Sequence, residues 1–446
     1  MRNDLRQGFP GGIHPTDGSD KALTAGKKIR TYLPDRVWIS MEQNPGGKCE
    51  PLVKKGDRVV RGQKIGDPRT FTASAVHASI NGIVTDIKEG KNAIYCAIQA
   101  EGEQPSRMGQ AGIALADLSG FDREKIVSAI REGGLVGMGG AGFPAAVKYS
   151  PKSPVDVLLI NAAECEPYLS CDDRLMIEQP IAVLNGVRLL WKASGAEKVF
   201  LCLEDNKPEA AKILGELTET ISEPIQVKTL PTRYPQGGER QLIQAVTGRE
   251  VPSGGLPADV GVIVSNVGTA KAAADILLND EPLTSRIVTI TGEVKEPANF
   301  LVPIGTSIQE LIEAAGGVKS TQNRVILGGP MTGNCIAVDY DGKNELGFVT
   351  KTTSGVVVLP PYQPEESPCI RCGGCASVCP AGLIPWQIDF AERQGNPALC
   401  EKLDAAECIA CGCCSYICPA KRELSFHTRQ ARDQVKQRIR ERMVRK

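Results

Sequence analysis

The spacing of apolar residues changes along this chain, and each change marks a different kind of structure. From Arg36 to about Ala100, short apolar runs are separated by Gly and Pro, as in small β-domains. From Asp122 onward, continuous apolar runs alternate with stretches of helical periodicity. This second pattern is typical of a mostly parallel sheet that helices cover on both faces. The chain is therefore predicted to be a multidomain α/β protein that begins with a β-domain.

The N-terminal part predicts an irregular arm followed by a small β-sandwich. Residues 53–66 and 77–84 have the shape of the two halves of a barrel-sandwich domain of the carrier type. Biotin or lipoate carriers place a modified Lys in a hairpin flanked by Met, and neither segment contains that context. We expect the fold of a carrier without the carrier function, within a first domain over residues 1–105.

The middle of the chain predicts a larger α/β domain over residues 106–284. Three apolar runs are expected to be strands, at residues 155–160, 198–203 and 260–265. Helices are expected before and between them, at residues 124–131, 181–194, 207–217 and 239–247.

A smaller unit over residues 285–345 has the pattern of a β-grasp module. Strands are expected at 286–291 and 325–327, with a helix at 307–315 between them. Ser307 stands three residues before Glu310, which is a capping-box arrangement for that helix. A Pro-rich linker leads to a cysteine-rich domain over residues 355–430. The basic tail, residues 431–446, is expected either to contact an anionic membrane surface or to form a solvated, partly helical end.

Composition narrows the class of protein. The 446 residues have a formal net charge of zero, so no overall attraction to nucleic acid is expected. The first residues lack the apolar core of a signal peptide, and no stretch approaches the roughly 18 apolar residues of a membrane span. We therefore expect a protein of a reducing compartment, on the cytoplasmic side, without a transmembrane helix of its own.

The cysteine-rich domain contains the pattern C-x2-C-x2-C-x3-C-P twice, and this is the bacterial pattern for [4Fe–4S] clusters. In such pairs the fourth Cys of each motif ligates the cluster of the other motif. One set of ligands is therefore predicted to be Cys369, Cys372, Cys375 and Cys418. The other set is predicted to be Cys408, Cys411, Cys414 and Cys379.

Two other uses of these cysteines are disfavoured. Four-Cys zinc sites use two CxxC pairs held apart by a longer loop, not a CxxCxxC run. Disulfides are typical of secreted chains, and nothing marks this one as secreted. Two neighbouring clusters transfer single electrons, so the protein is predicted to pass electrons between two partners.

A glycine-rich loop predicts the second functional site. Residues 133–144 contain G-x-G-x-x-G at Gly137, Gly139 and Gly142, but a helix and not a strand precedes the loop, so the ordinary Rossmann fingerprint does not apply. Bare backbone N–H groups can still approach a flat ring or a phosphate. Phe143-Pro144 is expected to start a helix, and Lys148 to add a positive charge.

Polar residues follow the next predicted strand. Asn161, Glu164 and Glu166 would lie at the carboxyl edge of the sheet, where α/β proteins bind ligands. Two acids there are suited to holding ribityl or ribose hydroxyls. The alternative is a polar loop without a ligand.

These residues carry a resemblance to a known family. The chain resembles the flavin- and NADH-binding subunit of respiratory complex I, and more closely the C subunit of the Rnf complex. The segments that carry the resemblance are Gly139-Gly140-Ala141-Gly142-Phe143-Pro144, Ala163-Glu164-Cys165-Glu166-Pro167-Tyr168, Tyr234-Pro235-Gln236-Gly237-Gly238-Glu239 and Gly11-Gly12-Ile13-His14-Pro15. The resemblance implies non-covalent FMN held by Gly137, Gly139, Gly140, Gly142, Lys148, Asn161, Glu164, Tyr234, Gly237 and Asn266. It also implies NAD(H) near Phe143, Glu166 and Glu239.

The resemblance further implies an activity and partners. Flavin accepts a hydride and releases electrons singly, which connects nicotinamide to iron–sulfur clusters. An Rnf subunit would be a peripheral membrane-associated oxidoreductase, exchanging electrons between NAD(H) and ferredoxin while membrane-embedded subunits move Na+ or H+. Two alternatives remain at this point: a soluble flavin/iron–sulfur protein of the cobalamin-reductase type, and an electron-transfer scaffold without nucleotide chemistry. No catalytic acid or base is predicted.

Overall fold

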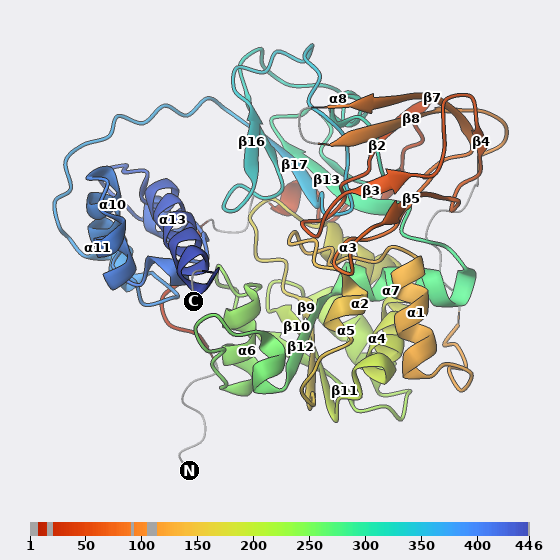
Figure 1. The fold of residues 1–446 in the computed structure, drawn as a ribbon, viewed down its shortest axis with the longest axis horizontal. Helices are drawn as coiled ribbons and strands as arrows, with labels where there is room; N and C mark the ends of the chain where they lie inside the picture. Colours follow the sequence, from red (N-terminus) through yellow and green to blue (C-terminus); the bar gives the residue numbers. More distant parts are fainter. Residues whose placement is uncertain (1–7, 16–20, 91–92, 105–113, 445–446) are drawn as a thin grey trace.

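The structure, a computed structural model, describes residues 8–15, 21–90, 93–104 and 114–444. Figure 1 shows a β-rich upper half, an α/β domain below it, and a small helical domain to one side. An extended connector joins the helical domain to the β-rich half. The architecture confirms the predicted fold class, since the elements follow in the expected order.

The N-terminal β-domain is a barrel-sandwich built from two small sheets. One sheet has the order β2 (Arg36–Ser40), β8 (Ile94–Ala100), β7 (Gly82–Glu89) and β4 (Arg58–Val59). The other has the order β3 (Cys49–Pro51), β5 (Lys64–Pro68) and β6 (Val76–His77). Side chains alternate across the strands, so that Val37, Ile39 and Ile98 are buried between the sheets.

The α/β domain is built on a parallel sheet with the order β11 (Ile225–Leu230), β10 (Lys198–Glu204), β9 (Val157–Ala162) and β12 (Val262–Asn266). Leu158 and Ile160 share a core with the helices α1 (Arg123–Glu132), α3 (Cys171–Glu178), α4 (Pro180–Ser194), α5 (Pro208–Thr218) and α7 (Val267–Asn279). Val157 and Leu159 pack on the opposite face with α6 (Glu239–Thr247). Both faces of the sheet are therefore covered, as the continuous apolar runs predicted.

The strand order points to the carboxyl ends of two strands of this sheet as a ligand site. The chain passes from β9 outward to β10 and β11, and then returns to the other side of β9 as β12. The sheet therefore extends from β9 in both directions, and open α/β sheets bind ligands at such a reversal of strand order, beyond the carboxyl ends of the strands. We call this edge, at the carboxyl ends of β9 and β12, the crevice. Asn161 and Asn266 are directly opposite each other in the register at this edge.

The β-grasp module is larger than the sequence predicted. Its sheet has the order β1 (Arg30–Thr31), β14 (Ala298–Pro303), β13 (Ser285–Gly292), β17 (Gly355–Leu359), β15 (Arg324–Leu327) and β16 (Asn334–Ala337), and α8 (Ile308–Ala314) packs on it. The expected boundary at residue 345 leaves out β17, which lies between β13 and β15. β17 is apolar on both faces because Val356 and Val358 enter the module's core while Val357 packs against Leu169.

The cysteine-rich domain consists of the helices α9 (Gly374–Ser377), α10 (Pro385–Arg393), α11 (Pro397–Lys402), α12 (Cys413–Tyr416) and α13 (Leu424–Val444). Short 3₁₀ turns lie at Lys21–Leu23, Pro257–Val260 and Ala405–Glu407. Helix α13 runs through the expected start of the tail at residue 431, because Ala431 and Val435 are buried with Ile388 of α10. Among the described residues, no helix is both long enough and apolar enough to cross a membrane.

Candidate cofactor sites

The glycine loop lies over the crevice between β9 and β12. Gly137 N–H donates to the Phe143 carbonyl at 2.8 Å, and Gly142 N–H donates to the Gly137 carbonyl at 3.1 Å. Met138 N–H donates to Oγ1 of Thr269 on α7 at 2.9 Å. The loop is thus closed on itself and fixed to α7. Thr269 was not predicted, since nothing near it in the sequence marks a partner for this loop.

The residues of this crevice fit a flavin mononucleotide. The backbone of residues 139–141 is exposed, and a Cβ added at Gly140, whose φ is +105°, would meet no heavy atom of the described residues within 4 Å. This open cradle leaves room for a flat ring or a phosphate against bare backbone. The ring of Phe143 is 42% exposed beside it, which suits stacking.

The amide side chains at the sheet edge connect the loops around the crevice. Asn161 Nδ2 donates to the Gly237 carbonyl at 2.8 Å. Asn266 Nδ2 donates to Oδ2 of Asp172 at 2.7 Å. A Cβ at Gly139 would lie 3.3 Å from Cβ of Asn266. The structure therefore brings together Gly139, Asn161, Gly237 and Asn266, which are far apart in the sequence.

An acidic group closes one side of the crevice. Glu164, with a left-handed φ of 46°, accepts the N–H groups of Asp172 at 2.7 Å and Asp173 at 3.2 Å. Burial, and then the charge of Glu164, raises the pKa of Asp172 to about 7 and that of Asp173 to about 6. The backbone at Glu164 adopts a conformation that side chains rarely take, as is common at binding sites.

Lys148 and Glu239 form a pair at the crevice. Lys148 Nζ donates to Glu239 Oε1 at 2.9 Å and to the Val264 carbonyl at 2.8 Å. The helix that Phe143-Pro144 was expected to start is α2 (Ala145–Lys148), a single turn. So short a helix has little dipole, and the positive charge in this region comes from Lys148 instead.

Two predicted nucleotide residues point toward other domains. Glu166 accepts the N–H groups of Met331 and Thr332, both at 3.0 Å, and burial raises its pKa. Tyr234 is buried, and its hydroxyl donates to the Cys411 carbonyl at 2.8 Å. Glu166 thus joins the α/β domain to the β-grasp module, and Tyr234 joins it to the cysteine-rich domain.

Lys21 is a further residue that the sequence did not predict. Its Nζ donates to the carbonyls of Glu164, Glu166 and Leu169 at 2.8, 2.9 and 2.6 Å. It therefore holds the loop that follows β9. No pattern around Lys21 distinguishes it from the other lysines of the N-terminal arm.

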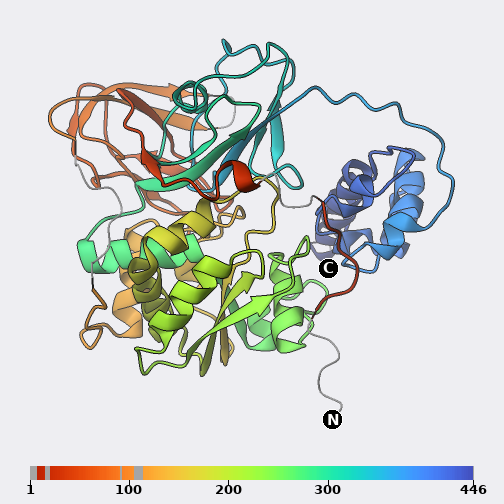
Figure 2. The same ribbon diagram turned by 180° about the vertical axis from the view of Figure 1, so that it is seen from behind.

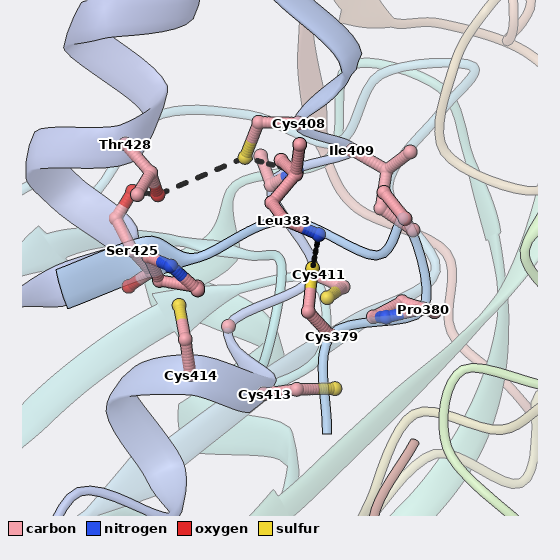
Figure 3. A pocket seen from close by; sticks show the side chains of 14 residues that line it. Cys379, Pro380, Leu383, Cys408, Ile409, Cys411, Cys413, Cys414, Ser425 and Thr428 are labelled. Carbon is pink, nitrogen blue, oxygen red and sulfur yellow. Dashed lines mark hydrogen bonds between the residues drawn. The ribbon is translucent and has the colours of Figure 1, made fainter. Parts of the chain in front are cut away.

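The cysteines lie around two separate cavities. Figure 3 shows one of them, where Cys379 faces the second motif. This cavity is lined by Cys379, Cys408, Cys411, Cys413 and Cys414. The other cavity is lined by Cys369, Cys372, Cys375 and Cys418. The fourth Cys of each motif thus lies with the first three of the other, and four thiols around one cavity are the donor set of a [4Fe–4S] cluster.

Known protein families match the chain domain by domain. The profile of the RnfC barrel sandwich hybrid domain matches residues 7–100, and that of the Nuo51 FMN-binding domain matches residues 130–275. The SLBB domain matches residues 287–334, and the 4Fe-4S dicluster domain matches residues 368–421. These profiles stand in the order of the domains described above.

Whole-chain relatives decide the family. The C subunit of the Na(+)-translocating ferredoxin:NAD(+) oxidoreductase complex of Acetobacterium woodii is 40% identical over 441 residues, covering 96% of this chain and 97% of the relative. The C subunit of the proton-translocating ferredoxin:NAD(+) oxidoreductase complex of Clostridium ljungdahlii is 39% identical, covering 86% of this chain and 84% of the relative. The chain belongs to the RnfC family.

A solved structure shares the fold of this RnfC-family chain. A chain in the crystal structure of an NAD+-reducing [NiFe]-hydrogenase, in the air-oxidized state, matches with a TM-score of 0.50 at 22% identity. The match covers 70% of this chain and 63% of the hydrogenase chain. It supports the arrangement of the domains and nothing finer.

Proposed function

We propose that this chain is the subunit of an ion-translocating complex that exchanges electrons between NAD(H) and ferredoxin. FMN would lie in the crevice between β9 and β12, and two [4Fe–4S] clusters would occupy the two cysteine cavities. Other subunits would embed the complex in the membrane and move Na+ or H+. The chain would bind peripherally, on the cytoplasmic side.

One loop carries this proposal because it contacts both candidate sites. Gly237 accepts the hydrogen bond of Asn161 at the crevice, while Tyr234, three residues earlier, donates to Cys411 beside the second-motif cavity. Cys165, next to Glu164, packs in the same buried group as Tyr234 and Cys413. The two sites are therefore separated by a short, packed path and not by solvent.

The residues around the crevice would bind and orient the cofactor and the nucleotide. FMN, when bound, supplies a group that takes a hydride and passes on electrons singly. The bare backbone at Gly140 would receive the flavin, and Lys148 would offset the charge of its phosphate. Phe143 would cover the nicotinamide face and exclude water there. Glu164, fixed by two backbone N–H groups, would accept hydroxyl hydrogen bonds.

The surroundings of the two cysteine cavities suggest where the protein partner binds. Cys369 and Cys372 are exposed, and Ile370 between them is 68% exposed. The second-motif cavity instead lies against the α/β domain through Tyr234. We therefore propose that the partner protein that carries single electrons binds next to the first motif. The second motif would exchange electrons with the flavin.

NADH-dependent reduction of a one-electron dye by the FMN- and cluster-loaded protein tests the proposal. Because Phe143 is partly exposed, Phe143→Ala is expected to leave the fold intact and to raise KM for NADH on the order of tenfold through lost stacking. Phe390→Ala removes another exposed aromatic ring, 57% exposed, from the cysteine-rich domain and should leave KM unchanged.

The same assay, repeated with ferredoxin and with cobalamin as acceptors in place of the dye, separates the alternatives. A protein that binds FMN and both clusters but does not oxidise NADH is a scaffold, and that outcome would contradict the proposal. A protein that oxidises NADH but reduces only cobalamin, and not ferredoxin, would belong functionally with the cobalamin reductases.

A further inference from the structure

The N-terminal arm at residues 9–15 runs between the α/β domain and the cysteine-rich domain. In Figure 2 the red arm passes between the blue cysteine-rich domain and the green α/β domain. The covalent linker, residues 360–368, is exposed throughout and has no helix or strand. The relative position of the two domains must therefore come from non-covalent contacts.

On one side the arm is attached to the α/β domain. Ile13 and Tyr234 exchange two backbone hydrogen bonds, of 2.8 and 2.9 Å, as an antiparallel bridge. Arg233 Nη1 donates to the Phe9 carbonyl at 3.1 Å, and its guanidinium lies 4.9 Å from the centre of the Phe9 ring. Phe9 and Ile13 are 4% and 5% exposed, so these two side chains of the arm are as buried as core residues.

On its other side the arm is attached to the cysteine-rich domain. Gly12 N–H donates to the Val378 carbonyl at 2.9 Å. The Tyr416 hydroxyl donates to the Pro15 carbonyl at 2.6 Å. Val378 precedes Cys379, the thiol that crosses from the first motif to the second cavity. The arm therefore contacts the backbone at a proposed ligand.

Two glycines allow the arm to contact both domains closely. Gly11 faces the cysteine-rich domain, and Gly12 faces the α/β domain. Gly11 has φ +69°, and an added Cβ would lie 2.6 Å from the Val378 carbonyl oxygen and 2.7 Å from the Cys379 carbonyl carbon. Gly12 has φ +81°, and its Cβ would lie 2.8 Å from the Tyr234 carbonyl oxygen. Such distances are shorter than any real carbon contact, so a side chain at either position would separate the arm from one domain.

We propose that residues 9–15 form an N-terminal clasp that fixes the second-motif cavity against the α/β domain, with Gly11 and Gly12 as positioning residues. The clasp bonds Tyr234 with one edge and contacts the Val378–Cys379 backbone with the other. It thereby adds to the direct contacts between the two domains, which include those of Tyr234 with the Cys411 carbonyl and of Arg240 with Glu407. Its consequence for electron transfer rests on the function proposed above, whereas the docking itself does not.

Hydrogen exchange of the full-length, cluster-loaded protein, measured without NADH, tests the clasp. Gly11→Ala is expected to raise exchange at the Gly12 amide about tenfold or more, because overpacking of this kind opens the contact. The Ile13 and Tyr234 amides should stay protected, since the arm keeps its bridge to the α/β domain. Gly8→Ala is the matched control, as its Cβ would meet no described heavy atom within 4 Å.

Gly12→Ala should give the converse pattern, with exchange raised at the Ile13 and Tyr234 amides. Tyr416→Phe provides a milder variant, in case either glycine variant does not fold. It removes the hydrogen bond to Pro15 and should raise exchange at Gly12 several-fold. The EPR signal of the second-motif cluster should change in Gly11→Ala, while that of the first-motif cluster stays as in the parent.

Unchanged exchange in Gly11→Ala and Tyr416→Phe would overturn the clasp, whatever the NADH activity. If hydrogen exchange changes as expected but the unsubstituted protein does not oxidise NADH, the clasp stands and the proposed function is overturned.

Discussion

The two cysteine motifs share the same spacing of cysteines but lie in different surroundings. The first motif presents Cys369 and Cys372 at the surface, next to the exposed Ile370. The second motif has Cys413 and Cys414 buried, and its Cys411 carbonyl accepts a hydrogen bond from Tyr234. A repeat therefore specifies two equivalent ligand sets, while docking onto the α/β domain gives each one a different environment.

The largest effect is expected from substitution of the cysteine that belongs to one motif but ligates the cluster of the other. Cys379→Ser is expected to remove the second-motif cluster, so that iron content falls by roughly half, while the EPR signal of the first-motif cluster remains. Cys413→Ser changes a buried thiol at the same cavity that does not occupy a ligand position of the motif, and it should keep the full iron content. Loss of the first-motif signal in Cys379→Ser would show that the ligands do not cross.

The second motif packs against the α/β domain, so the next test concerns the stability of that domain. Its free energy of unfolding is expected to depend on pH. Asp172 and Asp173 have folded-state pKa values raised from 3.8 to about 7 and about 6, first by burial and then by Glu164. The folded state therefore binds more protons than the unfolded chain between about pH 4 and pH 7. Its free energy of unfolding is expected to fall as pH rises through that window, by about 1.4 kcal/mol per pH unit for each proton.

Denaturant unfolding of the flavin-free protein between about pH 4 and about pH 7 measures this slope. Asp172→Asn should make the slope smaller, since the amide has no proton to lose. Asp339→Asn, at an exposed position with a left-handed φ of 56° that Asn adopts readily, should leave the slope as in the parent. A slope in Asp172→Asn equal to that of the parent would mean that Asp172 is already ionised in the folded protein across this window.

The smallest expected effect is that of a single hydrogen bond between the domains. Tyr234→Phe leaves the Cys411 carbonyl without its donor, and the expected loss of stability is about 1 kcal/mol. The EPR line shape of the second-motif cluster should change, and that of the first-motif cluster should not. Tyr362→Phe, on the exposed linker, is the matched control. Equal changes in both signals would mean that the two motifs share one environment.

Much of the fold followed from local patterns. Continuous apolar runs predicted β9, β10 and β12 to within two residues at their starts, and helical periodicity predicted α6 at Glu239–Thr247. The β-grasp boundary was missed because β17 is separated from β16 by a long irregular segment, and its place in the sheet depends on non-local pairing. Apolar spacing identifies a strand, but it does not say which sheet the strand joins.

For the candidate sites, too, some features followed from the sequence and others only from the tertiary structure. The sequence alone determined the types of chemistry: thiols at cluster spacing, a glycine loop with bare backbone, and amides and acids after a strand. The tertiary structure decided which of these groups meet. It placed Asn161 beside Asn266, turned Glu166 toward the β-grasp module, and joined Tyr234 to Cys411 through a loop that the N-terminal arm holds. Ligand spacing is a local property of the chain, whereas contacts between residues far apart in the sequence arise only when the domains pack.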